Sequence, residues 1–407
     1  MVWDRCTARL NRKRLILDVR DDLDTVSNQM EPVRLAVIGA GLIGVRHAEL
    51  VRAQAMCSLV GICDVDAGRK AVADALGVPF YRSAKELIER EQPSGAIIAT
   101  PNAHHAAVAE TCAKRSVHVL IEKPIADTLV QAQRIVETAS NCGTLVLVGH
   151  HRRHNPLAQK ARELVRGGTL GRLIGVSVLW ALMKPAEYFE VGWRRRRPGG
   201  GPLLINLIHD LDSLRFICGE IGQVYARTSS AVREFDVEDS LSISISFDNG
   251  ALGTVLASDA TPAAWSYEAA SGENPSYFHT NENCYYFLGT SASLAFPKME
   301  LWRYTDETRK GWEHPMERLH IEVDAVDPLK AQLEHFCRVV RGEEKPVVDA
   351  RDGARSLSVA LAVQESALKG IAINPSTLFP DGDQGSKRSA NKPDVQVTLD
   401  SAPDPQR

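Results

Sequence analysis

The sequence predicts an α/β fold: an N-terminal domain with a doubly wound parallel sheet, followed by a C-terminal α+β domain with a large, mostly antiparallel sheet. A chain of 407 residues exceeds what one hydrophobic core usually organises, which favours two domains. In the first part short apolar runs alternate with helical patterns. In the second part strand-like runs follow one another across short turns such as Asp248-Asn249-Gly250. The pattern of strands and helices changes near His150, where we expect the domain boundary.

Four segments follow from this pattern. We expect a flexible N-terminal extension at residues 1–31, a first domain at 32–150, a second domain at 151–375 and a disordered tail at 376–407. The extension is polar and lacks a strong period, and Met30 looks like a natural start, so residues 1–29 can stem from an upstream start codon. The tail is rich in Pro, Asp, Ser and Gly and poor in large apolar residues, which is typical of disorder.

The first domain contains five nearly continuous apolar runs, a pattern typical of parallel strands covered on both faces. These runs are VRLAVIG, SLVGICD, GAIIAT, VHVLIEK and TLVLVGH, and the helical patterns between them cover residues 42–55, 67–76, 103–115 and 127–140.

The second domain begins with a helical pattern near residues 155–167 and the long strand pattern GRLIGVSVLWALMK. After a glycine-rich loop we expect a helix from Pro202 to Cys218, because proline suits a first helical turn. Strand-like alternation follows in QVYARTSSAV, SLSISISF, GALGTVLASD and residues 284–304, and helical patterns return at 327–342 and 350–369.

Composition excludes several classes of protein. The net charge of −3, with basic and acidic residues intermixed, lacks the positive stripe that nucleic acid binding requires. No apolar run approaches the roughly 20 residues that cross a bilayer, and the start lacks a secretory apolar segment. The eight cysteines are irregularly spaced without a close pair. We expect a cytoplasmic protein with reduced cysteines, no metal site and no nucleic acid or membrane partner.

The first strand runs directly into a glycine-rich turn, Gly39-Ala40-Gly41-Leu42-Ile43-Gly44, and then a helix. This is the context of a dinucleotide fingerprint: the glycines allow a tight turn, approach to the pyrophosphate and close helix packing. Asp64 ends the second strand, where its carboxylate can bind the adenosine ribose hydroxyls and repel a 2′-phosphate. The pattern predicts a Rossmann domain that binds NAD rather than NADP, with Asp66 as the alternative acid.

Polar motifs follow two further strands, ATPNAHH at the end of GAIIAT and EKP at the end of VHVLIEK, where the carboxyl ends of parallel strands place ligands. Together with GHHRRHNP, Trp193-Arg194 and GGGPLLINLIHDLD, these motifs resemble the glucose-fructose oxidoreductase, inositol dehydrogenase and rhizopine-catabolism (Gfo/Idh/MocA) family over roughly residues 33–370. The predicted cofactor-binding residues are Gly39, Gly41, Leu42, Ile43, Gly44, Asp64, Thr100, Pro101, Asn102, His105, Glu122 and Lys123.

The resemblance implies that Lys123, the lysine of the EKP motif, lies beside the nicotinamide and the reacting carbon, after a cis bond to Pro124. An ammonium there can stabilise developing alkoxide charge. His209 matches the family histidine that enters the active site on a helix, and an imidazole can accept the hydroxyl proton.

The chain departs from the family at Ile205, where many of its polyol dehydrogenases carry an aspartate. Asn206 is the nearest polar residue and can share a helix face with His209. This departure puts inositol itself in doubt as the substrate. Lys123, His209 and Asn206 are the predicted catalytic residues.

The predicted substrate-binding residues are Lys123, Arg153, Trp193, Arg194, Asn206 and His209. Arginines of the WRRRRPGGG loop can clamp a carboxylate or phosphate, although most of them are more typical of a solvated loop. For Arg153 and His151 a structural role weighs as much as pocket lining, and we expect a structural role for Asp212.

Two functions remain open from the sequence. The first is NAD-dependent hydride transfer at a secondary alcohol or ketone of a sugar, cyclitol, sugar acid or related cyclic hydroxy compound. The alternative is a non-catalytic NAD-binding regulator of the same fold. The resemblance also implies a homodimer or homotetramer that pairs through the open face of the second sheet.

Overall fold

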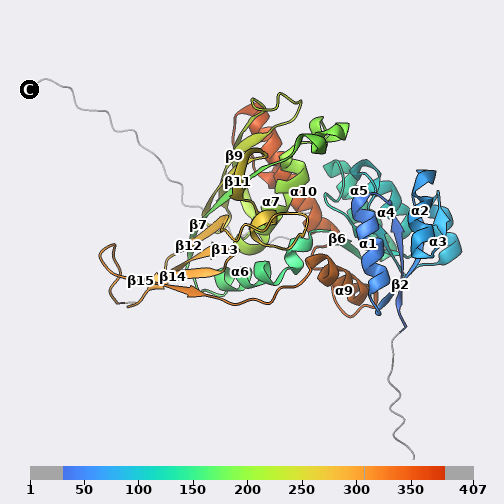
Figure 1. The fold of residues 1–407 in the computed structure, drawn as a ribbon, viewed down its shortest axis with the longest axis horizontal. Coiled ribbons are helices and arrows are strands. Elements are labelled where there is room, and N and C mark those ends of the chain that lie inside the picture. The colour runs from blue at the N-terminus through green and yellow to red at the C-terminus, as the bar shows by residue number, and fades with distance from the viewer. Residues whose placement is uncertain (1–30, 307, 381–407) are drawn as a thin grey trace, which may run out of the picture.

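The computed structural model describes residues 31–306 and 308–380 and contains two sheets, each flanked by helices (Figure 1). It confirms the predicted fold class, with one parallel and one largely antiparallel sheet.

The first sheet has six strands in the order β3-β2-β1-β4-β5-β6, and every pair is parallel. The strands are β1 (Val33–Ile38), β2 (Cys57–Cys63), β3 (Phe80–Tyr81), β4 (Gly95–Ile98), β5 (His118–Ile121) and β6 (Val146–Val148). The helices are α1 (Leu42–Ala53), α2 (Lys70–Leu76), α3 (Ala84–Glu91), α4 (His105–Ala113) and α5 (Leu129–Cys142). The strand order reverses between β1 and β4, so ligands are expected at the carboxyl ends of these strands.

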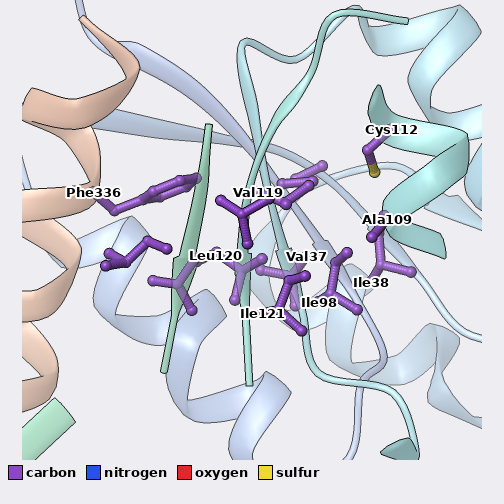
Figure 2. Packing of buried hydrophobic residues seen from close by; sticks show 14 of the residues in the cluster. Val37, Ile38, Ile98, Ala109, Cys112, Val119, Leu120, Ile121 and Phe336 are labelled. Atoms are coloured by element: carbon purple, nitrogen blue, oxygen red, sulfur yellow. The ribbon is translucent and has the colours of Figure 1, made fainter. Parts of the chain in front are cut away.

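The core of this domain includes a helix from much later in the chain. Helix α9 (Pro328–Val340) packs beside α1 (Figure 1), and Figure 2 shows its Phe336 ring next to strand residues such as Val119 and Leu120. Because the short strand β4 begins with Gly95, the Phe336 ring can lie where a larger side chain would stand. We predicted that residues 151–375, which include this helix, belong to the second domain. That prediction is wrong for α9, because the helix packs in the core of the first domain.

The second sheet has nine strands, with the path β15-β14-β13-β12-β7-β10-β9-β8 and β11 beside β7. Its pairs are antiparallel except β10 with β7. The strands are β7 (Leu173–Met183), β8 (Ile221–Ser229), β9 (Ser240–Phe247), β10 (Leu252–Ser258), β11 (Ala260–Trp265), β12 (Tyr285–Gly289), β13 (Ala292–Phe296), β14 (Glu300–Tyr304) and β15 (Met316–His320).

Helices α6 (Pro156–Arg166), α7 (Ile208–Cys218) and α10 (Ala350–Lys369) contribute to the core of the second domain. Strand β9 shows why the other face of the sheet stays open, because Leu241, Ile243 and Ile245 are buried while the serines between them are exposed. Period-two alternation of this kind produces one apolar and one solvated face.

Helix α10 joins the two domains. Ala354 and Leu357 near its N-terminal end belong to the core of the first domain, whereas Ala360 and Val363 belong to that of the second. A single straight helix therefore fixes the two cores relative to each other.

The predicted extension and tail lie mostly outside the described residues. Where the structure does describe the start of the tail, the chain forms the short helix α11 (Pro375–Leu378), and Phe379 is buried in the core of the first domain. The ordered part of the chain thus extends past the predicted boundary at residue 376, because the Phe379 ring has an apolar surface on which to pack.

Candidate active site

The glycine-rich turn between β1 and α1 has the shape that a dinucleotide pyrophosphate requires. Gly39 has a φ of +99°, and a Cβ there would lie 2.5 Å from the Ala99 backbone. A Cβ on Gly44 would lie 1.9 Å from the Gly39 carbonyl oxygen, whereas one on Gly41 would meet nothing within 4 Å. Gly39 and Gly44 thus permit the tight packing of strand and helix, and Gly41 leaves its surroundings open for a phosphate.

The surface beside this turn also fits the adenosine half of NAD. The side chain of Asp64 accepts hydrogen bonds from the backbone N–H of Ala40 at 2.7 Å and of Asp66 at 2.8 Å, so it is held at the end of β2. Leu42 and Val65 are 90% and 79% exposed, an apolar surface that a bound nucleotide would cover. The predicted cofactor residues Ile43, Thr100, Pro101 and Asn102 lie in the same turn or in the loop after β4, at the same edge of the sheet.

His105 has a different position from the one predicted. Its ring is fully buried, with Nε2 at 2.8 Å from the Thr100 carbonyl and Nδ1 at 3.0 Å from the Pro124 carbonyl. Burial lowers the pKa of His105. Because both nitrogens face backbone oxygens, we assign His105 the role of tying the loop after β4 to the loop after β5, in place of direct cofactor contact.

Glu122 also turns away from the predicted cofactor position. Its carboxylate accepts a hydrogen bond from the buried His47 of α1 at 2.7 Å. Although burial opposes ionisation, His47 and Lys123 hold the pKa of Glu122 at about 2. Glu122 therefore anchors the start of the Lys123 loop to α1, and we assign it a positioning role.

Lys123 stands at the junction of the two domains. It follows β5, is part-buried and precedes a cis bond to Pro124, as predicted. Its Nζ donates a hydrogen bond to the carbonyl oxygen of Ile205, 2.8 Å away in the second domain. Burial lowers the pKa of Lys123 to about 8, with Arg152 and Lys184 acting in the same direction.

His209 lies in the same region, buried on the first turn of α7. Its ring is 4.8 Å from that of His151 and 5.9 Å from that of His150. Burial, followed by the positive charge of Lys123, lowers the pKa of His209 well below its ordinary value. Its Nδ1 has no hydrogen-bond partner among the described residues. Burial and the nearby positive charges thus favour the neutral form of the His209 ring.

Asn206 precedes His209 by three residues and lies in a turn that departs from regular α-helical spacing. The segment Leu203–Leu207 is a π-helical turn, and such a wide turn shifts the helix phase. The Asn206 amide oxygen accepts from Lys184 at 2.8 Å and its amide nitrogen donates to Glu268 at 3.3 Å. The structure therefore places Asn206 in a polar network beside the site.

Sequence reasoning missed the other members of this network. Lys184 directly follows β7 and is buried 3.3 Å from Asp259, and Glu268 accepts hydrogen bonds from Trp180 and Arg152, each at 2.9 Å. Arg152 also pairs with Asp210 at 3.1 Å. A lysine that ends an apolar strand, as in LWALMK, is the one signal for Lys184 in the sequence. Glu268 lies in a segment without any recognisable motif.

Arg153 forms structural ion pairs. Its guanidinium donates two hydrogen bonds to Asp212, at 2.6 and 2.9 Å, and a third to Asp352 of α10. Both Arg153 and Asp212 are buried, and Arg153 lowers the pKa of Asp212 strongly. Of the two roles left open for Arg153, these contacts favour the structural one. Asp212 has the structural contacts that we expect.

Trp193 and Arg194 lie in the 3-10 segment Gly192–Arg195. Trp193 is 55% exposed, and Arg194 donates to the Tyr188 carbonyl at 2.8 Å while its guanidinium lies 4.1 Å from the centre of the Tyr188 ring. The two side chains remain available at the surface.

The described residues contain neither a group of metal ligands nor a membrane-spanning helix. No three His, Cys, Asp or Glu side chains are grouped so that they could hold a metal ion. Nor does any helix in the described ranges combine the length and apolarity needed to span a membrane.

The glycine turn, Asp64 and Lys123 define an oxidoreductase with an NAD-binding Rossmann domain. Residues 33–150 match the model described as oxidoreductase family, NAD-binding Rossmann fold, and residues 158–295 match the GFO/IDH/MocA C-terminal domain. The chain belongs to the Gfo/Idh/MocA family, which confirms the resemblance seen in the sequence.

Similar proteins include the myo-inositol 2-dehydrogenase of Thermotoga maritima, 26% identical over 82% of this chain and 96% of that protein. The scyllo-inositol 2-dehydrogenase (NAD⁺) of Bacillus subtilis is 26% identical over 84% of this chain and 96% of that protein. Among solved structures, an Agrobacterium radiobacter oxidoreductase in complex with NAD⁺, L-tartaric acid and magnesium has a TM-score of 0.73 and 21% sequence identity. The match covers 86% of this chain and 100% of that structure's chain. These findings support a catalytic oxidoreductase and give no support to the regulator.

Proposed function

We propose that the protein catalyses NAD-dependent hydride transfer at a secondary alcohol or ketone of a sugar, cyclitol, sugar acid or related cyclic hydroxy compound. The relatives named as inositol dehydrogenases support the substrate class. The observation that carries the proposal is the Nζ of Lys123, part-buried at the carboxyl edge of the Rossmann sheet and 2.8 Å from a carbonyl of the second domain.

When bound, NAD supplies the hydride acceptor. The open surroundings of Gly41 and the fixed Asp64 carboxylate would hold its pyrophosphate and adenosine ribose. The ammonium of Lys123 would donate a hydrogen bond to the substrate oxygen and stabilise the negative charge that develops there as its proton leaves.

His209 would accept that proton. Because burial and the neighbouring positive charges keep its pKa well below the ordinary value, the imidazole is neutral at physiological pH and its lone pair is available. In the direction of reduction, a proton on His209 would be readily donated to the carbonyl oxygen for the same reason.

Asn206 would act as a positioning residue. Its amide joins Lys184 to Glu268, and Glu268 in turn pairs with Arg152. The missing family aspartate at Ile205 is thus replaced by an amide in a charged network, which favours a substrate other than inositol.

The experiment is an assay of the purified protein with NAD and a panel of sugars, cyclitols and sugar acids, following reduced nicotinamide. We expect turnover with at least one member and weaker activity with NADP, whose 2′-phosphate Asp64 would repel. Tight NAD binding without turnover on the whole panel, unchanged by Lys123→Ala, would refute the proposed function.

We also propose a cytoplasmic homodimer or homotetramer with no nucleic acid or membrane partner. The open face of the second sheet supports the assembly, because it exposes large apolar side chains on neighbouring strands: Ile174, Leu252, Leu256, Tyr286 and Leu288. Light scattering should give a mass of two or four chains, reduced by Leu256→Glu. A monomer at micromolar concentration would contradict the assembly.

A further inference from the structure

A hollow rich in arginine lies at the junction of α6, α7, α10 and the loop before α10. Its volume is about 360 Å³, and five guanidinium groups line it: Arg153, Arg162, Arg166, Arg215 and Arg355. Three carboxylates, Glu220, Asp349 and Asp352, also line it.

The carboxylates orient the two buried arginines. Asp352 pairs with both Arg153 and Arg215, at 2.5 and 2.7 Å, and Glu220 pairs with Arg215 at 2.9 Å. Asp349 accepts the backbone N–H of Asp352 at the start of α10. These contacts hold the wall of the hollow rigidly.

The other side of the hollow carries positive charge without a carboxylate partner. Among the described residues, neither Arg162 nor Arg166 forms an ion pair. Arg162 lies 4.5 Å from the centre of the Phe216 ring, and Arg166 donates to the Ile217 and Arg215 carbonyls at 3.2 and 2.9 Å. The pKa of Arg166 is lowered by burial and then by the charge of Arg162, so the two cations repel each other. An anion between them would relieve this repulsion.

We propose that this hollow binds a phosphate group, either free or as a small phosphate monoester. Guanidinium groups from several separate elements suit a tetrahedral dianion, which accepts hydrogen bonds in several directions, better than a planar carboxylate. The volume lies at the lower end of the range of small-molecule sites, roughly 300–1,000 Å³. This is a second ligand site, separate from the NAD edge of the Rossmann sheet and independent of the proposed reaction.

The experiment measures binding of inorganic phosphate and of glycerol phosphate to the full chain by calorimetry, against chloride at equal ionic strength. Arg162→Gln is the test variant, because Arg162 is exposed and its guanidinium lies against the Phe216 ring. Lys160→Gln is the matched control, because it removes the same charge from the same helix while Lys160 pairs with Glu163 outside the hollow.

We expect phosphate binding that chloride does not reproduce. Arg162→Gln should lower the phosphate affinity about tenfold, as for loss of a charge-assisted hydrogen bond. The phosphate affinity of Lys160→Gln should stay within about twofold of wild type. Tighter binding of the ester would identify a monoester as the ligand, and equal binding would identify the free anion. The proposal would be overturned if the folded wild-type protein gave no heat of phosphate binding beyond that seen with chloride. It would also be overturned if both substitutions weakened phosphate binding equally. None of these readouts depends on enzyme turnover.

Discussion

The Nζ of Lys123, on the loop after β5, donates a hydrogen bond to the carbonyl of Ile205 in the π-helical turn of the second domain. This bond joins the NAD-binding domain to the helix that carries His209. Because a π-turn leaves backbone carbonyls outside the regular helical ladder, it supplies an acceptor that a continuous α-helix would not. A contact between the domains therefore links Lys123 to the turn that precedes His209, two of the three predicted catalytic residues.

Replacing Lys123 by methionine keeps much of the side-chain volume and removes the ammonium. We expect kcat to fall by a factor of about 10² to 10³, as for loss of one donor to a developing oxyanion. Calorimetry should show NAD affinity within about threefold of wild type, because the adenosine and pyrophosphate contacts lie elsewhere. A variant that retains wild-type kcat would contradict the role of Lys123.

The pH profile should report the state of Lys123. Its pKa is lowered to about 8, so the side chain is charged below that pH and neutral above it. For alcohol oxidation at saturating NAD, kcat/KM should be level between about pH 6.5 and 8 and fall about tenfold per pH unit above 8. His209 adds no rise in this window, because its pKa lies well below 6.5. Activity that increases through pH 8 would instead indicate that neutral Lys123 acts as the base.

Asp64→Ala should weaken NAD binding selectively. The substitution removes the carboxylate expected to accept the ribose hydroxyls, and loss of such bonds typically raises KM by about tenfold or more. The preference for NAD over NADP should narrow, because the repulsion of a 2′-phosphate disappears. Asp66→Ala is the control, since the Asp66 side chain accepts a hydrogen bond from the Gly68 backbone N–H and pairs with Arg69 at 3.8 Å, both within three residues along the chain. Equal effects of both substitutions would count against Asp64 as the ribose ligand.

Arg153→Met tests the structural role of this arginine. The substitution leaves the buried Asp212 carboxylate without both of its hydrogen bonds from Arg153, so we expect the free energy of unfolding to fall by about 3 kcal/mol. Urea denaturation measures this change, with the exposed Arg172→Met as control. Unchanged stability together with a higher substrate KM would restore the substrate-binding interpretation.

Arg194→Ala separates acidic from neutral substrates. If the part-buried Arg194 clamps a carboxylate, kcat/KM should fall about tenfold or more for sugar acids and change little for neutral sugars. Steady-state kinetics on matched acid and alcohol pairs provides the measurement. An equal loss for both classes would indicate that Arg194 only holds the loop through the Tyr188 carbonyl.

Much of the fold was predictable because the relevant signals are local. Five apolar runs with intervening helical patterns predict the parallel sheet, and the glycine turn between β1 and α1 follows from residues 39–44 alone. The boundary of the first domain was not predictable in the same way. Phe336 and Phe379 belong to its core although they lie far along the chain, and an apolar side chain does not specify which of two cores will bury it.

The sequence by itself determined the NAD-binding turn, the acid at the end of the second strand and the positions of Lys123 and His209, because each lies in a short motif at the end of a strand or on a helix. Only the tertiary structure decided which polar groups pair. It assigned Glu122 to His47, Arg153 to Asp212, and Asn206 to Lys184 and Glu268. Hydrogen bonds and ion pairs act over a few ångströms in space, and residues as far apart in the chain as His47 and Glu122 reach that distance only once the chain has folded.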